Sequence, residues 1–495
     1  MSRSEKPEPR DAVRDDRRQR DDEDRRADSE RRTHPAVHGP ARLSGGASRL
    51  RGFRSASDGV ASVLRALRAA LHSPNRNARS AVVIGRLLGI AFVICFATGV
   101  YSHFLQDPLP GMRFPTSPRS LYAFTQGLHI TAGIAIIPLL FAKLNTVLPS
   151  LLQMPPVRNV LHLLERASIA VFVGGALVQV FTGLVNTFQW YPWPFPFRQT
   201  HYAMAYVLIG SLAVHIGVKL RIIVRYWRRR DSVDADGRFI PDRTVGSELL
   251  PDSDRAVVEP SRDDARDRGR SLVRRVERWI DDERQPVVPR QRATESGRLA
   301  RRGFLAAIAS GVAGVVVLTV GQSNALAQPL NVFAPRQRGL GPNGLPINRT
   351  AHAAGVLDTA RAADWALTVS AHGVRKRFSR TDLRALGLVT VQLPIACVEG
   401  WSQMATWRGV RLRDLITAVG APPDSRLKIT SLEQHGAYRI MEMGPEYAAD
   451  PTTVVALELN GEDLDIDHGY PARIMAPGRP GVLQTKWLAS IEVMA

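Results

Sequence analysis

Five apolar runs constrain this chain more than any other feature of its sequence. Each has about the length needed to cross ~30 Å of hydrocarbon, which takes about 20 helical residues. Soluble helices this long and this apolar on all sides are rare. The sequence therefore predicts a multi-domain membrane protein with an α-helical transmembrane bundle of four spans, plus a fifth span that acts as an anchor or export segment. The runs are 81–101, 121–148, 167–188, 202–224 and 304–326.

The distribution of positive charge predicts how these spans are oriented. Arg76 and Arg79 precede the first run, Lys143 and Arg158 flank the turn between the second and third, and Arg-rich sequence follows the fourth. The other two loops are poorer in Arg and rich in aromatic residues and Pro. By the positive-inside rule the N-terminus is cytoplasmic, the aromatic loop lies at the outer interface, and residues 328–495 are external.

Two charged blocks, 1–79 and 227–300, hold more than half of the charged residues of a chain whose formal net charge is +20. They mix Arg with Asp and Glu and contain few aromatic residues, which is typical of disordered, solvated segments. We therefore expect no nucleic acid partner, although such charge leaves that alternative open. The predicted organisation is a disordered tail, a helical membrane domain, a disordered linker, a membrane segment and an external domain. Their bounds are 1–79, 80–226, 227–300, 301–327 and 328–495.

The chain has two cysteines, Cys95 in an apolar run and Cys397 in soluble-looking sequence. These two residues are not expected to meet, which excludes a disulfide framework and a thiolate zinc site. A lone thiol in a soluble domain is either an inert core group or a reactive or metal-binding one.

The fifth run begins after Arg301 and Arg302, with Phe304 and Leu305 following, and it ends in an Ala-Leu-Ala sequence before Gln328. This pattern resembles a bacterial twin-arginine export signal placed inside the chain, a route that carries domains already folded around a cofactor. The alternative is ordinary positive flanking of a last membrane span.

Histidines within the spans predict a metal function, because ionisable groups inside a bilayer are costly. His201 and His215 are 14 residues apart, about 40° short of four helical turns and ~21 Å apart along the axis. This spacing suits two stacked haems held by imidazoles from two helices. Judged by depth, His129 pairs with His201 and His162 with His215, while His103 competes with His129. The alternative for His103 and His162 is an interfacial position.

The residues around these histidines resemble four-helix membrane cytochrome b modules. The matching stretches are GLHITAG, FAKL and HYAMAYVLIGSLAVHIGVKL, and the resemblance covers about 81–226. It implies haem b (one or two groups), exchange of electrons with quinone or quinol, and electron transfer across the membrane.

Residues 328–495 alternate short β-like runs with Gly and Pro, which predicts an α+β, mainly β domain. The expected strands include 366–369, 427–429, 454–459 and 473–476, and one amphipathic helix is expected at 412–419. Cys397 follows a run at 391–395, so it is expected at a strand end. A strand-end loop can present one thiolate to a metal.

Two motifs of this domain resemble the molybdopterin-binding domain of the sulfite oxidase superfamily, and most of all the bacterial methionine-sulfoxide reductase catalytic subunits. The motifs are CVEGWSQMATWRG, which contains Ser402, and DHGYPARIMAPGRPGVLQTKWLASIEV. The resemblance implies that Cys397 binds molybdenum beside the pterin dithiolene. Ser402 is assigned to cofactor binding with its motif.

Charged residues near these motifs are expected to complete the site. A pterin phosphate needs fixed cations, which His468, Arg473 and Lys486 can supply. Asn348 and Arg349 are expected to bound the pterin or substrate mouth, and Tyr438 is the expected proton donor, with Glu399 and His435 as alternatives. In each case the competing interpretation is structural: surface ion pairs for Arg473 and Lys486, and a satisfied turn histidine for His468.

The sequence thus favours a molybdopterin-dependent oxidoreductase in a bacterial plasma membrane, with membrane lipid and quinol as partners. Its expected reaction is reduction of a small-molecule or protein S-oxide, or of an N-oxide, outside the membrane. The chain lacks the charged residues that follow the metal-binding cysteine in sulfite oxidases, so sulfite is the less favoured substrate. Three alternatives remain at this point: a sulfite-type dehydrogenase that donates electrons to quinone, a non-enzymatic membrane sensor or assembly protein, and, least favoured, a transporter.

Overall fold

The computed structural model describes residue 63 and residues 78–151, 160–227 and 295–494. Apart from residue 63, all of these belong to one compact unit that spans residues 64–495. The expected disordered blocks lie almost entirely outside the described residues.

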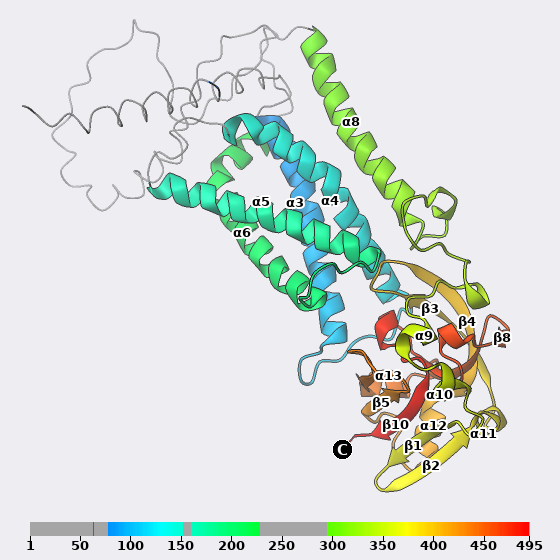
Figure 1. Ribbon diagram of the computed structural model, residues 1–495. Coiled ribbons are helices and arrows are strands. Elements are labelled where there is room, and N and C mark those ends of the chain that lie inside the picture. Colours follow the sequence, from blue (N-terminus) through cyan, green and yellow to red (C-terminus); the bar gives the residue numbers. More distant parts are fainter. Residues whose placement is uncertain (1–62, 64–77, 152–159, 228–294, 495) are drawn as a thin grey trace, which may run out of the picture. The chain divides into compact units, whose positions relative to one another are not determined.

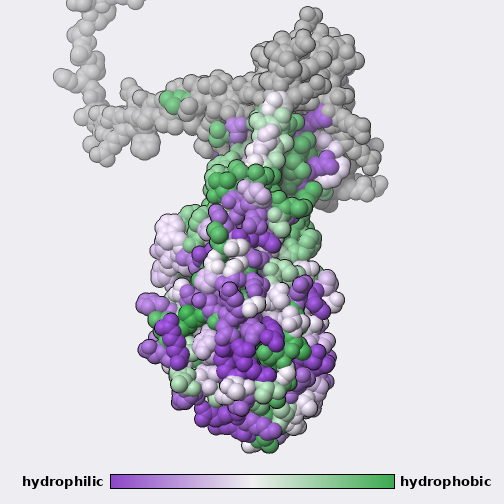
Figure 2. All heavy atoms as spheres, turned by 90° about the vertical axis from the view of Figure 1, so that its right-hand side faces the viewer, coloured by the Kyte–Doolittle hydropathy of each residue, from purple (hydrophilic) through white to green (hydrophobic). Residues whose placement is uncertain are grey.

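Five long helices account for the five apolar runs. All five are long and apolar enough to cross a membrane. Figure 2 shows hydrophobic surface over the helices and a largely hydrophilic surface over the strand-rich domain. The helices are α3 (Ala78–Gln106), α4 (Leu121–Leu151), α5 (Val160–Thr187), α6 (Phe197–Trp227) and α8 (Glu295–Val320).

The first four of these helices form two hairpins, α3 with α4 and α5 with α6, and α3 also packs on α6 (Figure 1). We call α3 to α6 the helical bundle. Its buried core includes Leu88, Phe92, Leu140, Phe172 and Leu208. Helix α8 packs along α4.

Among the helix ends that differ from the sequence prediction, two lie near the C-terminal domain. Helix α3 continues past Tyr101 to Gln106, so Ser102 and His103 lie on its last turns rather than in a loop. Helix α8 ends at Val320, earlier than expected, because the chain turns back at Gly321. A Cβ at Gly321 would lie 2.5 Å from the carbonyl oxygen of Ala327, so only glycine permits this close return.

The C-terminal domain (residues 328–494) contains two five-stranded sheets, as expected for a mainly β domain. One has the order β2-β1-β10-β5-β6, with β1 and β10 parallel, and the other β3-β4-β7-β8, with β9 paired to β7. The first sheet contains β1 (Ala366–Ala371), β2 (Val374–Ser379), β5 (Leu427–Ser431), β6 (Ile440–Met443) and β10 (Leu488–Val493). The second contains β3 (Val389–Ala396), β4 (Ser402–Arg411), β7 (Val454–Leu459), β8 (Glu462–Asp463) and β9 (Arg473–Met475).

Short helices fill the connections of this domain. The predicted amphipathic helix is α12, and its apolar side chains, among them Leu412, Leu415 and Ile416, are buried. The helical segments are η3 (Gln328–Leu330), η4 (Pro342–Gly344), α9 (Ala351–Ala354), α10 (Leu357–Arg361), α11 (Arg380–Ala385), α12 (Leu412–Ala418), α13 (Pro445–Ala449), η5 (Ile466–His468) and η6 (Gly481–Leu483).

Strand β7 is buried along its whole length, which explains why all of its residues except Glu458 are apolar. Val455 and Leu457 face a core shared with the first sheet. Val454 and Ala456 face a second core, which also contains Cys397 and the buried indoles of Trp401 and Trp407. Side chains alternate between the two faces of a strand, so one strand supports both cores. The end of β3, which Cys397 directly follows, is therefore fixed by packing.

Candidate active site

Cys397 lies in a tight turn directly after β3. Its backbone N–H donates to the carbonyl of Trp401 at 2.9 Å, and the N–H of Gly400 donates to the carbonyl of Cys397 at 3.0 Å. Gly400 has φ +103°, a conformation that favours glycine. We call residues 397–401 the Cys397 loop. Its backbone hydrogen bonds hold the thiol in place from both sides.

A second segment approaches this loop closely. A Cβ at Gly481 would lie 2.9 Å from the carbonyl oxygen of Ala396 and 3.4 Å from the Cα of Cys397. Residue 481 must therefore be glycine, or the two segments must separate. This contact places the segment from Gly481 to Lys486 beside the thiol.

Burial governs the charge of the thiol and its neighbours. The Cys397 side chain is 1% exposed, and burial raises its pKa well above the usual value, with the Glu399 carboxylate adding to the rise and Lys486 opposing it. Burial also raises the pKa of Glu399, against the nearby guanidinium of Arg336. The isolated thiol is therefore protonated at neutral pH, and a cation that binds it must displace the proton.

Lys486 stands at the centre of a polar cluster. Its ammonium donates to the side-chain oxygen of Asn348 at 3.1 Å, the carbonyl of Arg349 at 2.7 Å and the carbonyl of Asp467 at 2.9 Å. Burial, with the charge of Arg473, lowers the pKa of Lys486 to about 7. Three acceptors match the three N–H groups of an ammonium. The lysine thus fixes the 348–349 segment in the site.

Arg349 is held on the far side of this cluster. Its guanidinium pairs with the Glu433 carboxylate at 2.8 Å and donates to the carbonyl of His435 at 2.9 Å. Arg349 and Glu433 both line the cavity described below. They contribute charge to its wall.

Arg473 and His468 lie deeper in the domain. The Arg473 guanidinium donates to the carbonyl of His468 at 2.9 Å and lies 5.0 Å from the ring centroid of Trp407. The Nε2 of His468 faces the carbonyls of Pro342 and Leu345 at 2.9 and 3.2 Å. Since carbonyls only accept, this nitrogen carries the proton.

Ser402 and Tyr438 both contact residues outside the C-terminal domain. The backbone N–H of Ser402 donates to the carbonyl of Gln322, just beyond α8, at 3.0 Å. The hydroxyl of Tyr438 donates to the side-chain oxygen of Gln106 on α3 at 3.0 Å. Tyr438 also lines the cavity, whereas Ser402 is absent from its lining.

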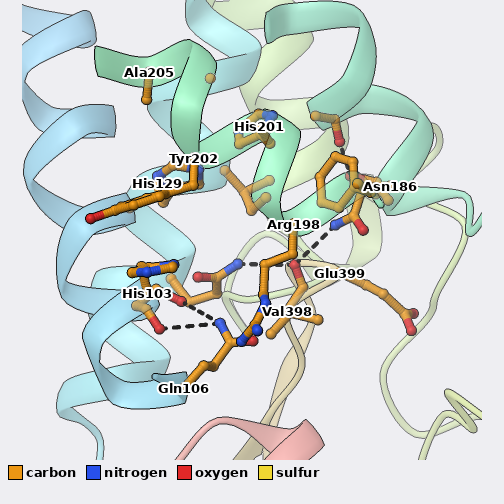
Figure 3. A pocket seen from close by; sticks show the side chains of 18 of the residues that line it. His103, Gln106, His129, Asn186, Arg198, His201, Tyr202, Ala205, Val398 and Glu399 are labelled. Atoms are coloured by element: carbon orange, nitrogen blue, oxygen red, sulfur yellow. Dashed lines mark hydrogen bonds between the residues drawn. The ribbon is translucent and has the colours of Figure 1, made fainter. Parts of the chain in front are cut away.

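One cavity of about 640 Å³ joins the helical bundle to the Cys397 loop (Figure 3). Its walls come from α3, α4, α5 and α6 and from four segments of the C-terminal domain. Val398 and Glu399 of the Cys397 loop line the cavity, as do Thr485 and Lys486 of the 481–486 segment. His103, His129 and His201 line the same cavity from the helices.

His129 and His201 are oriented in the same way. The Nδ1 of His129 lies 3.0 Å from the carbonyl of Cys95 and 3.1 Å from the hydroxyl of Thr98. The Nδ1 of His201 lies 3.0 Å from the hydroxyl of Thr182. Both hydroxyls donate to carbonyls of their own helix, at 2.6 and 2.8 Å, so they accept from the imidazoles. Each Nδ1 therefore carries the proton, and each Nε2 has a lone pair for a metal.

Glycine beside each threonine gives the two rings room. A Cβ at Gly99 would lie 3.1 Å from the Cε1 of His129, and one at Gly183 would lie 3.4 Å from the Cε1 of His201. The two hairpins thus repeat one arrangement: a Thr-Gly pair on the first helix faces a histidine on the second.

The other three predicted histidines have different surroundings. The ring of His103 stacks on Tyr202 with centroids 3.5 Å apart, and its buried Nδ1 has no partner among the described residues. His215 stacks on Phe172 at 5.8 Å and is not part of the cavity lining. His162 lies in the first turn of α5, but its side chain is outside the described residues.

Comparison with known proteins identifies the C-terminal part of the chain. Residues 353–495 match the family model described as oxidoreductase molybdopterin binding domain. This part of the chain is a molybdopterin-binding oxidoreductase domain. The chain is therefore an enzyme, and the sensor, assembly-protein and transporter alternatives are set aside.

Several curated proteins resemble the molybdopterin domain. Sulfite oxidase of Arabidopsis thaliana is 27% identical over 210 residues, which cover 34% of this chain and 52% of that protein. Mitochondrial sulfite oxidase of Rattus norvegicus is 33% identical over 102 residues, which cover 18% of each chain. NAD(P)H nitrate reductase of Hordeum vulgare is 29% identical over 164 residues, or 26% of this chain and 18% of that one. The chain therefore spans about half the length of the plant sulfite oxidase and under a fifth of the other two.

Among solved structures, sulfane dehydrogenase SoxCD of Paracoccus pantotrophus matches with 22% identity and a TM-score of 0.24. The match covers 26% of this chain and 38% of that one. At this score the likeness carries no argument about the site.

The residues present fit a molybdenum cofactor. Cys397 offers one soft thiolate, the ligand type that suits such a metal. The buried Thr485 hydroxyl and the Nε of Arg473 have no hydrogen-bond partner within the described residues, although buried polar groups are normally paired. Thr485 lines the cavity beside Lys486, where a phosphate or pterin heteroatom would satisfy its hydroxyl, whereas Arg473 lies outside the cavity lining.

Sequence reasoning missed four polar residues of the helices that contact the site. Two of them orient the cavity histidines, namely Thr98 and Thr182. The other two donate to the carbonyl of Val398 in the Cys397 loop, namely Gln126 and Asn186. The two Thr-Gly pairs, 98–99 and 182–183, were a usable signal, because each lies in the helix that precedes a histidine-bearing helix. Gln126 and Asn186 had only their polarity within an apolar run to mark them.

His468 makes the stability of the molybdopterin domain sensitive to acid. Burial, with the charges of Arg473 and Lys486, lowers its pKa from 6.5 to about 4. Between these values the unfolded chain binds the proton and the folded chain does not. The free energy of unfolding therefore falls as pH drops from 6.5 to 4, and this group causes no further loss below pH 4. The expected loss is about 3 kcal/mol. Thermal unfolding of the full chain in detergent at several pH values measures it.

The matched variant is His468→Gln, whose amide can still donate to the two carbonyls but does not titrate. It should show a flatter dependence on pH than the parent over this window. Equal slopes for the two proteins would show that His468 is not the group responsible.

Proposed function

We propose that this chain is a membrane-bound molybdenum oxidoreductase that couples a haem b and quinone electron pathway in its helices to two-electron oxygen-atom transfer on an external substrate. The observation that supports this most is the shared cavity: the Cys397 loop forms one part of its wall, and His129 and His201 form another. The loop that carries the candidate thiolate and two imidazoles with an available Nε2 thus adjoin one space.

The haem part of the proposal depends on the two imidazoles. A b-type haem between two helices needs one neutral nitrogen from each, with the ring orientation fixed by a hydrogen bond to the other nitrogen. His129 and His201 meet these requirements. A second haem would use His215 and His162, so the number of haems is one or two.

At the molybdenum site, the bound cofactor would supply the two-electron oxygen-atom chemistry. The chain's own residues have simpler tasks. Cys397 would bind the metal as a thiolate, and Lys486 and Arg349 would place positive charge near anionic groups of the cofactor or substrate. Tyr438 reaches the same cavity and would hold a proton at its hydroxyl oxygen, with Glu399 as the second candidate. The apolar helix faces around the cavity would limit water.

Reduction of an S-oxide or N-oxide, with quinol as the electron source, is the reaction we favour, on the basis of the Cys397 motif. A sulfite-type dehydrogenase that donates electrons to quinone is the second candidate, and similarity to sulfite oxidases from plant and animal favours it. The five apolar helices support a plasma-membrane protein in contact with lipid. The loop charges favour a cytoplasmic N-terminus and an external molybdopterin domain.

The two directions can be separated with the purified full chain. A reductase should oxidise reduced viologen when dimethyl sulfoxide, methionine sulfoxide or trimethylamine N-oxide is added, and should not reduce ferricyanide with sulfite. The opposite pattern would assign the sulfite-type reaction. Heat-treated protein controls for direct chemical reaction between donor and acceptor.

Cys397→Ser should abolish molybdenum binding, because the hydroxyl is a hard and weakly acidic substitute for a thiolate. Elemental analysis of the detergent-purified protein should give about one molybdenum per chain for the parent and a value near zero for the variant. Cys95→Ser, which changes the chain's other cysteine, should retain the metal. If Cys397→Ser kept full molybdenum, the assignment of this thiol would be wrong.

His129→Ala and His201→Ala should each prevent haem binding at the cavity, since each deletes one of the two imidazoles that would hold the iron. Reduced-minus-oxidised spectra of the purified variants measure the b-type bands. His103→Ala tests the competing pairing and should keep the bands, because the His103 ring is stacked on Tyr202. Loss of haem in His103→Ala but not in His129→Ala would reverse the assignment.

A further inference from the structure

The carbonyl oxygen of Val398 connects the Cys397 loop to the helical bundle. It accepts a hydrogen bond from the side-chain amide of Gln126 on α4 at 3.1 Å. It also accepts one from the side-chain amide of Asn186 on α5 at 3.4 Å (Figure 3). Val398 directly follows Cys397. Both amides are buried, with Gln126 6% and Asn186 8% exposed. Two different helices therefore hold the peptide next to the thiol.

A directed chain of hydrogen bonds supports Gln126. The Tyr438 hydroxyl donates to Gln106 at 3.0 Å, the Gln106 amide donates to the Ser102 hydroxyl at 3.4 Å, and Ser102 and Tyr122 are 3.2 Å apart. Tyr122 in turn donates to Gln126 at 3.5 Å. Every donor therefore points the same way, from Tyr438 towards Val398, and such chains strengthen cooperatively.

The same two helices carry one cavity histidine, His129, and the threonine that orients the other, Thr182. Gln126 lies three residues before His129 on α4, and Asn186 lies four residues after Thr182 on α5. Residues three and four apart share one face of a helix. Thr182 fixes the ring of His201. The contact with Val398 thus lies within one helical turn of His129 on α4, and within about one turn of the threonine that orients His201 on α5.

Further contacts hold the rest of the loop against the helices. A Cβ at Gly400 would lie 2.7 Å from the side chain of Ile130 on α4. The Glu399 carboxylate accepts from the Gln189 amide and pairs with Arg336 at 3.4 Å. If the molybdopterin domain swung away from the bundle, these buried polar groups would lose their partners.

We propose that Gln126 and Asn186 are positioning residues, which clamp the Val398 carbonyl and so fix the Cys397 thiolate relative to the cavity that His129 and His201 face. This inference rests on the proposed function for its purpose: electrons would pass within one chain between two sites held at constant separation. Each turnover needs two electrons, which quinol supplies one at a time with release of two protons.

The clamp can be tested without reference to activity. In the full chain, the double variant Gln126→Met and Asn186→Leu keeps side-chain volume and removes both donors. Hydrogen–deuterium exchange in peptides covering residues 395–404 should become at least about tenfold faster, because the loop is no longer held. Thr146→Val is the matched control: it removes a buried hydroxyl from α4 that bonds to the Lys143 carbonyl of its own helix, and the loop should exchange as in the parent.

A second measurement addresses the purpose of the clamp. In protein loaded with both cofactors, the rate of electron exchange between haem and molybdenum after a light pulse should fall at least about tenfold in the double variant, while the haem spectrum and molybdenum content stay unchanged. In the parent this rate should not depend on protein concentration.

The outcomes separate the two proposals. Unchanged loop exchange in the double variant would overturn the clamp and leave the proposed function standing. If the parent held no haem or no molybdenum, the proposed function would fail, and loop exchange would still decide whether the clamp exists. Faster loop exchange with an unchanged electron-exchange rate would overturn the positioning role.

Discussion

The backbone hydrogen bond from Cys397 to Trp401 is the interaction on which the site depends. It closes a turn whose glycine adopts a positive φ and whose thiol is almost fully buried. Because the turn is closed, the Val398 carbonyl faces away from its own domain and is free to accept from the helices. A more open loop would lose both the fixed thiol and the contact with the bundle. Packing around β7 keeps the strand before this turn in place.

Polar side chains inside apolar helices impose a second constraint. In hydrocarbon an unpaired donor is costly, so each polar group must find a partner within the protein. Here the partners converge: threonines bond to imidazoles, and amides bond to the molybdopterin domain. The polar positions that line the cavity therefore mark the functional surface of the bundle.

Much of this architecture could be predicted from the sequence. The apolar runs give the five helices, β-like runs give parts of β1, β3, β5, β7 and β9, and the motif around Cys397 leads to the domain that the comparisons identify. The sequence did not predict β4, which begins at Ser402 and contains Gly409 beside the Val455 carbonyl. Its mixed polar and apolar pattern follows from contact with two different cores, and this information is not local.

The site was predictable in its residue types but not in its contacts. Lys486 and Arg473 were expected to face a phosphate, and the structure shows that backbone carbonyls take up much of their donor capacity. His129 and His201 could be paired by depth along the helices, whereas their shared ring orientation depends on threonines of neighbouring helices. Such cross-helix contacts have no signature in a single sequence beyond the Thr-Gly repeat.

The return of the chain at Gly321 has a consequence for assembly. Just after this turn, the carbonyl of Gln322 accepts a hydrogen bond from the backbone N–H of Ser402 at the start of β4. Helix α8 therefore holds the molybdopterin domain close to the surface of the bundle that it contacts. A tether of this kind gives the docking contact an effective concentration in the millimolar range or above. A handful of hydrogen bonds is then enough for occupancy, whereas two separate proteins would need an interface of about 1,000 Å². Covalent connection also fixes the stoichiometry of the helical bundle and the molybdopterin domain at one to one.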